Sequence, residues 1–167
     1  MIPRVPGVDS PKVVDCVTAL TGNPHVGEKV VVIGGGLVGC ETAVGYAQAG
    51  KTVTVVEALP DILSAGIPVP ESNEQMLRDL LAEGKVAIKT ACHLSAVTDA
   101  GVTLSTPDGE ETLEADTVVL AVGFTPRDSL AGDLLGSGLE VYPVGDGVKV
   151  GSVMTAVAAG YTAGRKI

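Results

Sequence analysis

Residues 29–42 read KVVVIGGGLVGCET, and this stretch decides the fold. It opens with a short β-branched run, Lys29–Ile33, which is typical of a buried strand. Three glycines follow at residues 34–36, and the Ala-rich segment after them ends at Gly50, a plausible helix C-cap. A second β-branched run, Thr52–Val56, comes next. The order of strand, glycine turn, helix and strand predicts a parallel β-α-β unit.

The rest of the chain extends this unit into an α/β fold. Ser72 and Gln75 resemble a capping box that starts a helix, and Gly84 ends it. Short alternating segments separated by turn residues then predict an antiparallel meander. We expect a Rossmann-like three-layer domain with a parallel sheet and a three-stranded antiparallel meander. The other predicted elements are a helix near 13–20, a turn at 21–24, a strand at 86–88, meander strands at 93–99, 101–106 and 111–114, a strand at 117–122, helices near 129–135 and 153–164, and a strand at 141–144.

Composition and charge exclude several classes of protein. The chain has 167 residues, 46% hydrophobic, with one Phe, three Tyr and no Trp, which suits buried parallel strands under small-residue helices. The net charge of −9 argues against nucleic-acid binding. No apolar run reaches 18 residues, so no membrane-spanning helix is expected. The Pro-containing start does not resemble a signal peptide, and we expect a cytoplasmic protein.

The cysteines and histidines predict no metal site or redox disulfide. Cys16, Cys40 and Cys92 are widely spaced and form no C-x-x-C pair, so reduced thiols are expected. Cys40 reads as buried helix packing. His25 and His93 are far apart, and we interpret both as surface or structural residues.

The glycines have the spacing of a dinucleotide-binding turn. Gly34 would allow the tight turn, Gly36 would let the backbone approach a pyrophosphate, and Gly39 would let the helix pack close to the strand. The free N–H groups at the helix start would then face the phosphates. The alternative is a merely tight strand-to-helix turn, but the strand and helix context favours a dinucleotide site.

Two glutamates extend this prediction. Glu57 ends the second strand, 23 residues after Gly34, where a carboxylate accepts hydrogen bonds from the adenosine ribose and repels a 2′-phosphate. No Lys or Arg lies between Lys51 and Arg78, so NADH is favoured over NADPH. The alternative for Glu57 is an exposed strand-end carboxylate. Glu41 either suits the helix dipole or contacts the nicotinamide, and its position alone leaves both open.

Several stretches resemble a known superfamily. The segments VVVIGGGLVGCETA, GKTVTVVEALP, ADTVVLAVGFTPR and YPVGD resemble the pyridine-nucleotide two-domain flavoproteins. The lead-in PRVPGVDSPKVVDCVTALTG, taken with GGGLVGCETA, resembles the NADH:flavin oxidoreductases related to 2,4-dienoyl-CoA reductase and 2-enoate reductase, multidomain members of the old yellow enzyme family. The resemblance implies an FMN-binding barrel, an iron–sulfur cluster, an FAD domain and an inserted NAD(P)H domain. Electrons would pass from NADH to FAD and on to an activated alkene, such as an enoate or a dienoyl-CoA.

The resemblance also implies roles for individual residues. Glu57 would bind the adenosine ribose, and Glu41 would lie near the nicotinamide. Asp146, in VGD, would contact the ribityl–phosphate region of FAD. The remaining cofactor-binding residues would be Gly34, Gly35, Gly36, Leu37, Val38 and Gly39 at the pyrophosphate, with Val122 and Gly123 against the dinucleotide.

The predicted organisation has three parts. Residues 1–28 would lead in from an FAD domain, residues 29–140 would bind NADH, and residues 141–167 would return to the FAD domain. The sequence contains no upstream FAD glycine motif, no cysteine cluster and no room for a barrel. The chain alone is therefore expected to bind a nucleotide and not to reduce a substrate, with no catalytic residue of its own. Residues 141–167 would be mobile, packed on the core, or paired with another copy in a homo-oligomer.

Three other functions stay open. The chain could belong to a disulfide reductase or NADH oxidase of the same superfamily. It could be a non-catalytic NAD(H) sensor, although a sensor would have no use for a flavin-facing Asp146. A nucleotide-free structural domain would require the glycine pattern and Glu57 to be coincidental.

Overall fold

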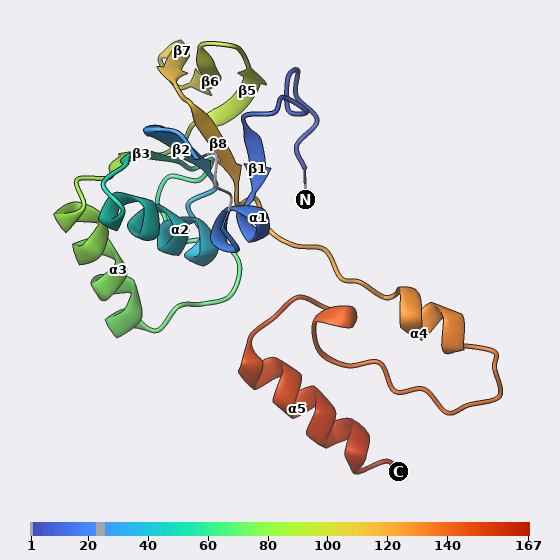
Figure 1. Cartoon of the computed structure of the whole chain (residues 1–167). Coiled ribbons are helices and arrows are strands. Elements are labelled where there is room, and N and C mark those ends of the chain that lie inside the picture. Colours follow the sequence, from blue (N-terminus) through green and yellow to red (C-terminus); the bar gives the residue numbers. More distant parts are fainter. Residues whose placement is uncertain (1, 23–25) are drawn as a thin grey trace. The chain divides into compact units, whose positions relative to one another are not determined.

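The computed structural model describes residues 2–22 and 26–167, which form two compact units, residues 2–123 and residues 124–167. The predicted α/β class is confirmed (Figure 1). The predicted turn at 21–24 lies partly outside the described residues, and His25 lies wholly outside them. The first unit contains β1 (Val13–Asp15), α1 (Cys16–Leu20), β2 (Lys29–Ile33), α2 (Leu37–Gln48), β3 (Thr52–Val56), α3 (Glu71–Glu83), β4 (Ala87–Lys89), β5 (His93–Val97), β6 (Gly101–Thr106), β7 (Gly109–Glu114) and β8 (Thr117–Leu120).

A five-stranded parallel sheet forms the centre of this unit. Its strand order is β1-β8-β2-β3-β4, so β2 lies between β8 and β3. Successive side chains of β2 point to opposite faces of the sheet. Val30 and Val32 pack with the helices, whereas Val31 and Ile33 pack with the meander. Both faces are therefore covered, as the continuous apolar sequence of β2 predicts.

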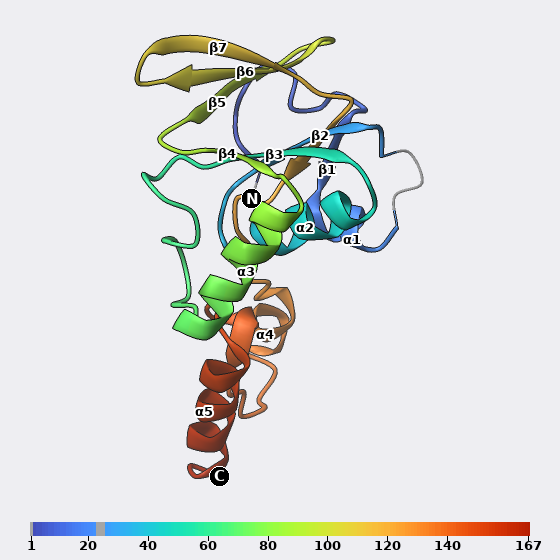
Figure 2. The same cartoon turned by 90° about the vertical axis from the view of Figure 1, so that its left-hand side faces the viewer.

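The predicted three layers are confirmed. Helices α1, α2 and α3 lie on one face of the parallel sheet, and the antiparallel sheet β5-β6-β7 lies on the other (Figure 2). The buried side chains of Val102 and Leu104, on β6, face the parallel sheet and join the second apolar cluster. This arrangement leaves the carboxyl ends of β2, β3 and β8 at a common edge.

The predicted helix over residues 13–20 is wrong in its first part. Val13, Val14 and Asp15 form a strand that pairs with β8, and only Cys16–Leu20 is helical. The β-branched valines find a parallel neighbour that is remote in sequence. Asp15 then caps the helix by accepting hydrogen bonds from the backbone amides of the next turn.

The predicted capping box at Ser72 is also wrong. Helix α3 begins at Glu71, with Pro70 as its N-cap residue. The Pro70 carbonyl accepts the N–H groups of Asn73 and Glu74, so the helix starts before Ser72. The end of α3 is as predicted, since Gly84 is its C-cap residue.

The second unit, residues 124–167, has little buried structure. It contains α4 (Ser129–Leu134), a 3₁₀ turn η1 (Gly145–Gly147) and α5 (Val153–Gly164). The predicted strand at 141–144 is absent, because no described strand pairs with it. Helix α5 has the predicted bounds and a capping box between Ser152 and Thr155, but none of its residues is buried.

Candidate functional site

The outer glycines of the motif are required by packing. Gly34 follows β2 with φ +109°, a left-handed conformation that favours glycine. A Cβ on Gly34 would lie 2.4 Å from the carbonyl oxygen of Ala121, just after β8. A Cβ on Gly39 would lie 1.9 Å from the carbonyl oxygen of Gly34. These two glycines therefore let α2 approach the strand ends closely.

Gly36 differs from both. A Cβ built on Gly36 would meet no atom within 4 Å, and its φ of −72° suits any residue. Nothing inside the chain therefore requires a glycine at this position. Its missing side chain leaves open space directly in front of α2, which is the room that a closely approaching pyrophosphate needs.

At the start of α2, no side chain binds the free N–H groups or balances the positive end of the helix dipole. Gly36 is its N-cap residue, and no side chain caps the helix or places a negative charge in its first turn. Leu37 is 38% exposed and Val38 is half-buried, so the first turn borders the surface. The N–H groups of the first turn and the positive end of the helix dipole can receive an anion.

Glu57 lies beside the turn and is 7% exposed, so the alternative of an exposed strand-end carboxylate is wrong. Its Oε2 accepts the N–H of Gly35 at 2.6 Å, and its Oε1 accepts the N–H of Leu59 at 2.8 Å. A carboxylate has about four acceptor sites, so each oxygen can still accept another donor. Glu57 can thus fix the turn and also receive ribose hydroxyl groups.

Comparison with known proteins shows the family of the chain. Residues 1–162 match the pyridine nucleotide-disulphide oxidoreductase family. The chain belongs to this family. Its relatives are oxidoreductases, and family membership implies the use of FAD and NAD(P)H.

Two large reductases are among the similar proteins. Cinnamate reductase of Clostridium sporogenes is 38% identical over 156 residues, which cover 93% of this chain and 24% of the relative. The structure of a 2-naphthoyl-CoA reductase is 35% identical with a TM-score of 0.88, and the match covers 99% of this chain and 25% of that one. An NADH oxidase of Thermoanaerobacter brockii is 37% identical over 136 residues, which cover 80% of this chain and 20% of the oxidase. The chain thus spans between a fifth and a quarter of the length of these relatives.

The other residues that the sequence predicts to bind a cofactor lie in both units. Glu41 is exposed on α2, and Val122 is half-buried just after β8. Gly123 follows with φ +91°. Asp146 lies in the second unit, where its Oδ1 accepts the N–H of Gly151 at 3.0 Å. The structure therefore gathers the glycine turn and Glu57 in one unit and places Asp146 in the other.

Cys40 is a buried neighbour of the turn. Its Sγ donates to the carbonyl oxygen of Gly35 at 3.3 Å. Burial raises the pKa of the Cys40 thiol to about 11. The thiol is therefore neutral near pH 7, and Cys40 is buried, as predicted. Cys16 and Cys92 are buried as well.

The segment after β3 also contacts the glycine turn, which no sequence pattern indicates. The N–H of Leu63 donates to the carbonyl oxygen of Gly35 at 2.7 Å. Arg78 of α3 binds Asp61 and the carbonyl oxygen of Ile62 in the same segment. The i,i+4 spacing of Glu74 and Arg78 in the sequence indicates an ion pair on α3, but nothing local indicates its contact with residues 61 and 62.

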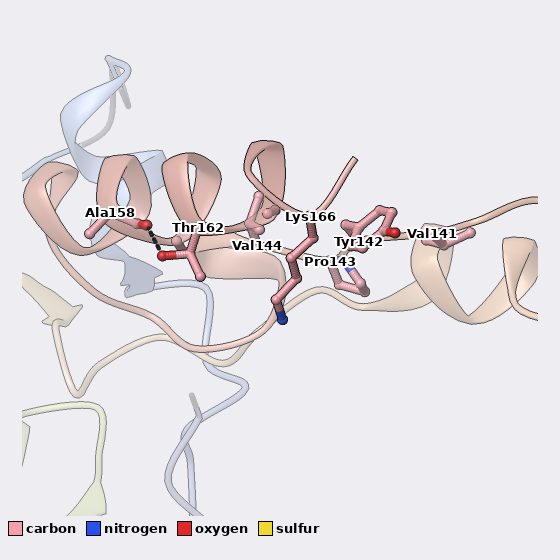
Figure 3. Close-up of a pocket in the computed structure, with 9 residues that line it drawn as sticks. Val141, Tyr142, Pro143, Val144, Ala158, Thr162 and Lys166 are labelled. Carbon is pink, nitrogen blue, oxygen red and sulfur yellow. Dashed lines mark hydrogen bonds between the residues drawn. The ribbon is translucent and has the colours of Figure 1, made fainter.

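The second unit contains an open cavity of about 460 Å³ between residues 141–144 and one side of α5 (Figure 3). Its walls are mostly Val, Ala and Pro side chains. Thr162 turns its hydroxyl back to the carbonyl oxygen of Ala158, at 2.8 Å, and Lys166 lies at the rim. None of the residues that line the cavity belongs to the glycine turn or is Glu57.

Within the described ranges, no helix is long and apolar enough to cross a membrane. The same residues contain no cluster of His, Cys, Asp or Glu that could hold a metal ion. His93 is exposed at the start of β5.

Proposed function

We propose that this chain is the NADH-binding part of a multidomain flavin-dependent oxidoreductase, which passes a hydride from NADH to FAD for the reduction of an activated alkene such as an enoate or a dienoyl-CoA. The observation that carries the proposal is the open space at Gly36, in front of an uncapped helix and beside a buried carboxylate. Packing accounts for Gly34 and Gly39, whereas a closely approaching pyrophosphate would account for a glycine at position 36.

In this proposal the turn residues Gly34 to Gly39 hold the pyrophosphate with backbone N–H groups, and Glu57 receives the ribose. NADH is preferred because a 2′-phosphate would face the Glu57 carboxylate. Glu41 lies near the nicotinamide, and Val122 and Gly123 border the dinucleotide. These residues bind and orient the cofactor, while the hydride chemistry belongs to NADH and the flavin.

The proposed organisation assigns residues 29–140 to the NADH-binding domain. Residues 1–28 and 141–167, with Asp146, would complete an FAD domain whose remaining parts belong to the full-length enzyme, together with FMN and an iron–sulfur cluster. The coverage of about a quarter of each relative supports this assignment. The names cinnamate reductase and 2-naphthoyl-CoA reductase support an unsaturated acid or thioester as the final acceptor.

A second candidate is the corresponding part of an NADH oxidase, which the similarity to the Thermoanaerobacter brockii protein favours. Both candidates share the NADH site and differ in the final electron acceptor. The full-length enzyme separates them: NADH consumption driven by cinnamate without oxygen supports the alkene reductase, whereas consumption that requires oxygen supports the oxidase.

The binding step is tested by calorimetric titration of the chain with NADH and, in parallel, with NADPH. We expect NADH to bind at least tenfold more tightly, and we expect Gly36→Val to abolish binding. Glu57→Arg is a poor test of the preference, because it would also remove both backbone hydrogen bonds of Glu57. Equal affinity for the two nucleotides in the unaltered chain would refute the assigned role of Glu57.

A further inference from the structure

We infer that Arg78 is a positioning residue for the dinucleotide site. It holds residues 61–63 against the glycine turn and so fixes the turn in the conformation that receives the pyrophosphate. The inference rests on the proposed function, but its structural part can be tested without a nucleotide.

Arg78 holds the segment through a fork of hydrogen bonds. Its Nη1 donates to Asp61 Oδ1 at 3.1 Å and its Nη2 to Asp61 Oδ2 at 2.8 Å. Nη2 also donates to the carbonyl oxygen of Ile62 at 3.2 Å. From its own helix, Glu74 Oε1 accepts Nε at 3.0 Å and Nη2 at 2.9 Å. The planar guanidinium group is thereby held on two sides, a geometry that lysine cannot reproduce.

The held segment contacts the turn at Gly35. The Leu63 N–H donates to the Gly35 carbonyl oxygen, and the Gly35 N–H donates to Glu57. Ile62, 1% exposed, packs so closely that a Cβ on Gly35 would lie 2.8 Å from its Cγ2. Both polar groups of the Gly35 backbone are therefore fixed from outside the turn.

The backbone of Leu63 shows that the segment is held in place. Leu63 has φ +60°, a left-handed conformation that a leucine rarely adopts, and it is 8% exposed. Such a residue keeps its conformation only when its surroundings determine it. The Arg78 bonds lie immediately before Leu63 in the chain and supply that constraint.

In this arrangement the positive charge of Arg78 is paired with two carboxylates. Asp61 and Glu74 both pair with it, at 2.8 and 2.9 Å. Arg78 is the first cation after Lys51 in the sequence, so pairing removes the nearest downstream candidate for a 2′-phosphate partner. Arg78 therefore acts on the site through residues 61–63 and not through the ligand.

The test measures hydrogen exchange of single amides in the unliganded chain, followed by calorimetry with NADH. In Arg78→Met we expect the Leu63 amide to exchange at least tenfold faster and the NADH Kd to rise at least tenfold. The amides of Val31 and Val119, in the central strands, should keep their exchange rates. Arg78→Lys should restore only part of the loss, since one ammonium group cannot make all the contacts.

Lys51→Met is the matched control, because it breaks another partly exposed ion pair, with Glu28, at the end of β3 opposite to Glu57. It should change neither the Leu63 amide nor the NADH Kd. Should Arg78→Met fail to fold, Asp61→Asn tests the same contact with a side chain of equal size. Unchanged Leu63 exchange in a folded variant, or equal acceleration of the Val31 and Val119 amides, would overturn the inference. Absence of NADH binding by the unaltered chain would instead refute the proposed function.

Discussion

At the scale of single residues, the glycines of the turn are constrained for different reasons. A side chain on Gly34 or Gly39 would collide with backbone, whereas one on Gly36 would meet only open space. The sequence pattern predicts all three positions, because they share one spacing. Only the three-dimensional contacts separate the two glycines that packing requires from Gly36, at which packing requires none.

This difference predicts opposite effects of two alanine substitutions. Gly39→Ala should lower the free energy of unfolding by about 1–3 kcal/mol or more, because its Cβ must displace the Gly34 carbonyl. Gly36→Ala should change stability by less than about 1 kcal/mol and weaken NADH binding at least tenfold. Urea unfolding and calorimetry measure the two effects. Wild-type affinity in Gly36→Ala would contradict the assignment of the open space to the pyrophosphate.

Glu57 is predicted to stabilise the fold as well as bind the ribose. Glu57→Gln leaves one amide nitrogen facing a backbone N–H donor, and losing such a buried bond should cost about 1–3 kcal/mol. Glu41→Gln, on the exposed face of α2, is the matched control and should stay within about 0.5 kcal/mol of the wild type. Equal stability of the two variants in urea would show that the hydrogen bonds of Glu57 do not support the turn.

Cys40 predicts a loss of stability in alkaline solution. Burial raises the pKa of this thiol from 9.0 to about 11, so the unfolded thiol ionises at a lower pH than the folded one. Its stabilisation is complete below pH 9 and is lost as the pH rises towards 11. Between these values the wild type should lose about 1–3 kcal/mol more stability than Cys40→Ala. Parallel unfolding curves of the two proteins would argue against a neutral buried thiol.

At the scale of elements, local sequence signals predict the presence of a helix better than the residue at which it begins. The helix over 153–164 is found with its predicted bounds, and Gly84 ends α3 as predicted. The start of α3 is earlier than predicted, because the Pro70 carbonyl begins the helical bonds. Asp15 lies inside the helix predicted over 13–20 but is instead a helix cap, because the strand before it depends on a distant partner.

The two helix starts predict a matched pair of cap substitutions. Asp15→Ala should lower the free energy of unfolding by about 1 kcal/mol, because Asp15 Oδ1 accepts the Val17 and Thr18 amides at 3.0 Å. Ser72→Ala should change it by less than about 0.5 kcal/mol, since Ser72 caps nothing. The hydroxyl and amide of Thr18 lower the pKa of Asp15, so the difference should diminish as the pH falls below about 4. Thermal unfolding at pH 7 and pH 3 measures both effects.

At the scale of the whole molecule, the chain consists of two units that differ in how much of their apolar surface is buried. The unit of residues 2–123 has two apolar clusters, one on each face of its sheet. In residues 124–167, helix α5 exposes Val153 by 82% and Met154 by 77%. A surface this apolar is typical of a segment that packs against further structure.

A shortened chain tests this division. A chain ending at Arg127 retains the glycine turn, Glu57 and both apolar clusters. We expect it to unfold cooperatively and to keep the NADH affinity of the full sequence within about threefold. We also expect it to lose most of the binding of a hydrophobic fluorescent dye, because α5 is gone. Loss of NADH binding on shortening would show that residues 128–167 contribute to the site.

The sequence by itself determined the order of strands and helices around residues 29–57 and the glycine spacing, because turns and buried strands have local chemical signatures. It also determined the position of Glu57, since a strand of given length ends at a definite residue. The tertiary structure decided that Glu57 is buried and bonded to Gly35, that β1 joins β8, and that Arg78 holds the segment beside the turn. These features join residues far apart in the chain, and such contacts exist only after the sheet and helices have packed together.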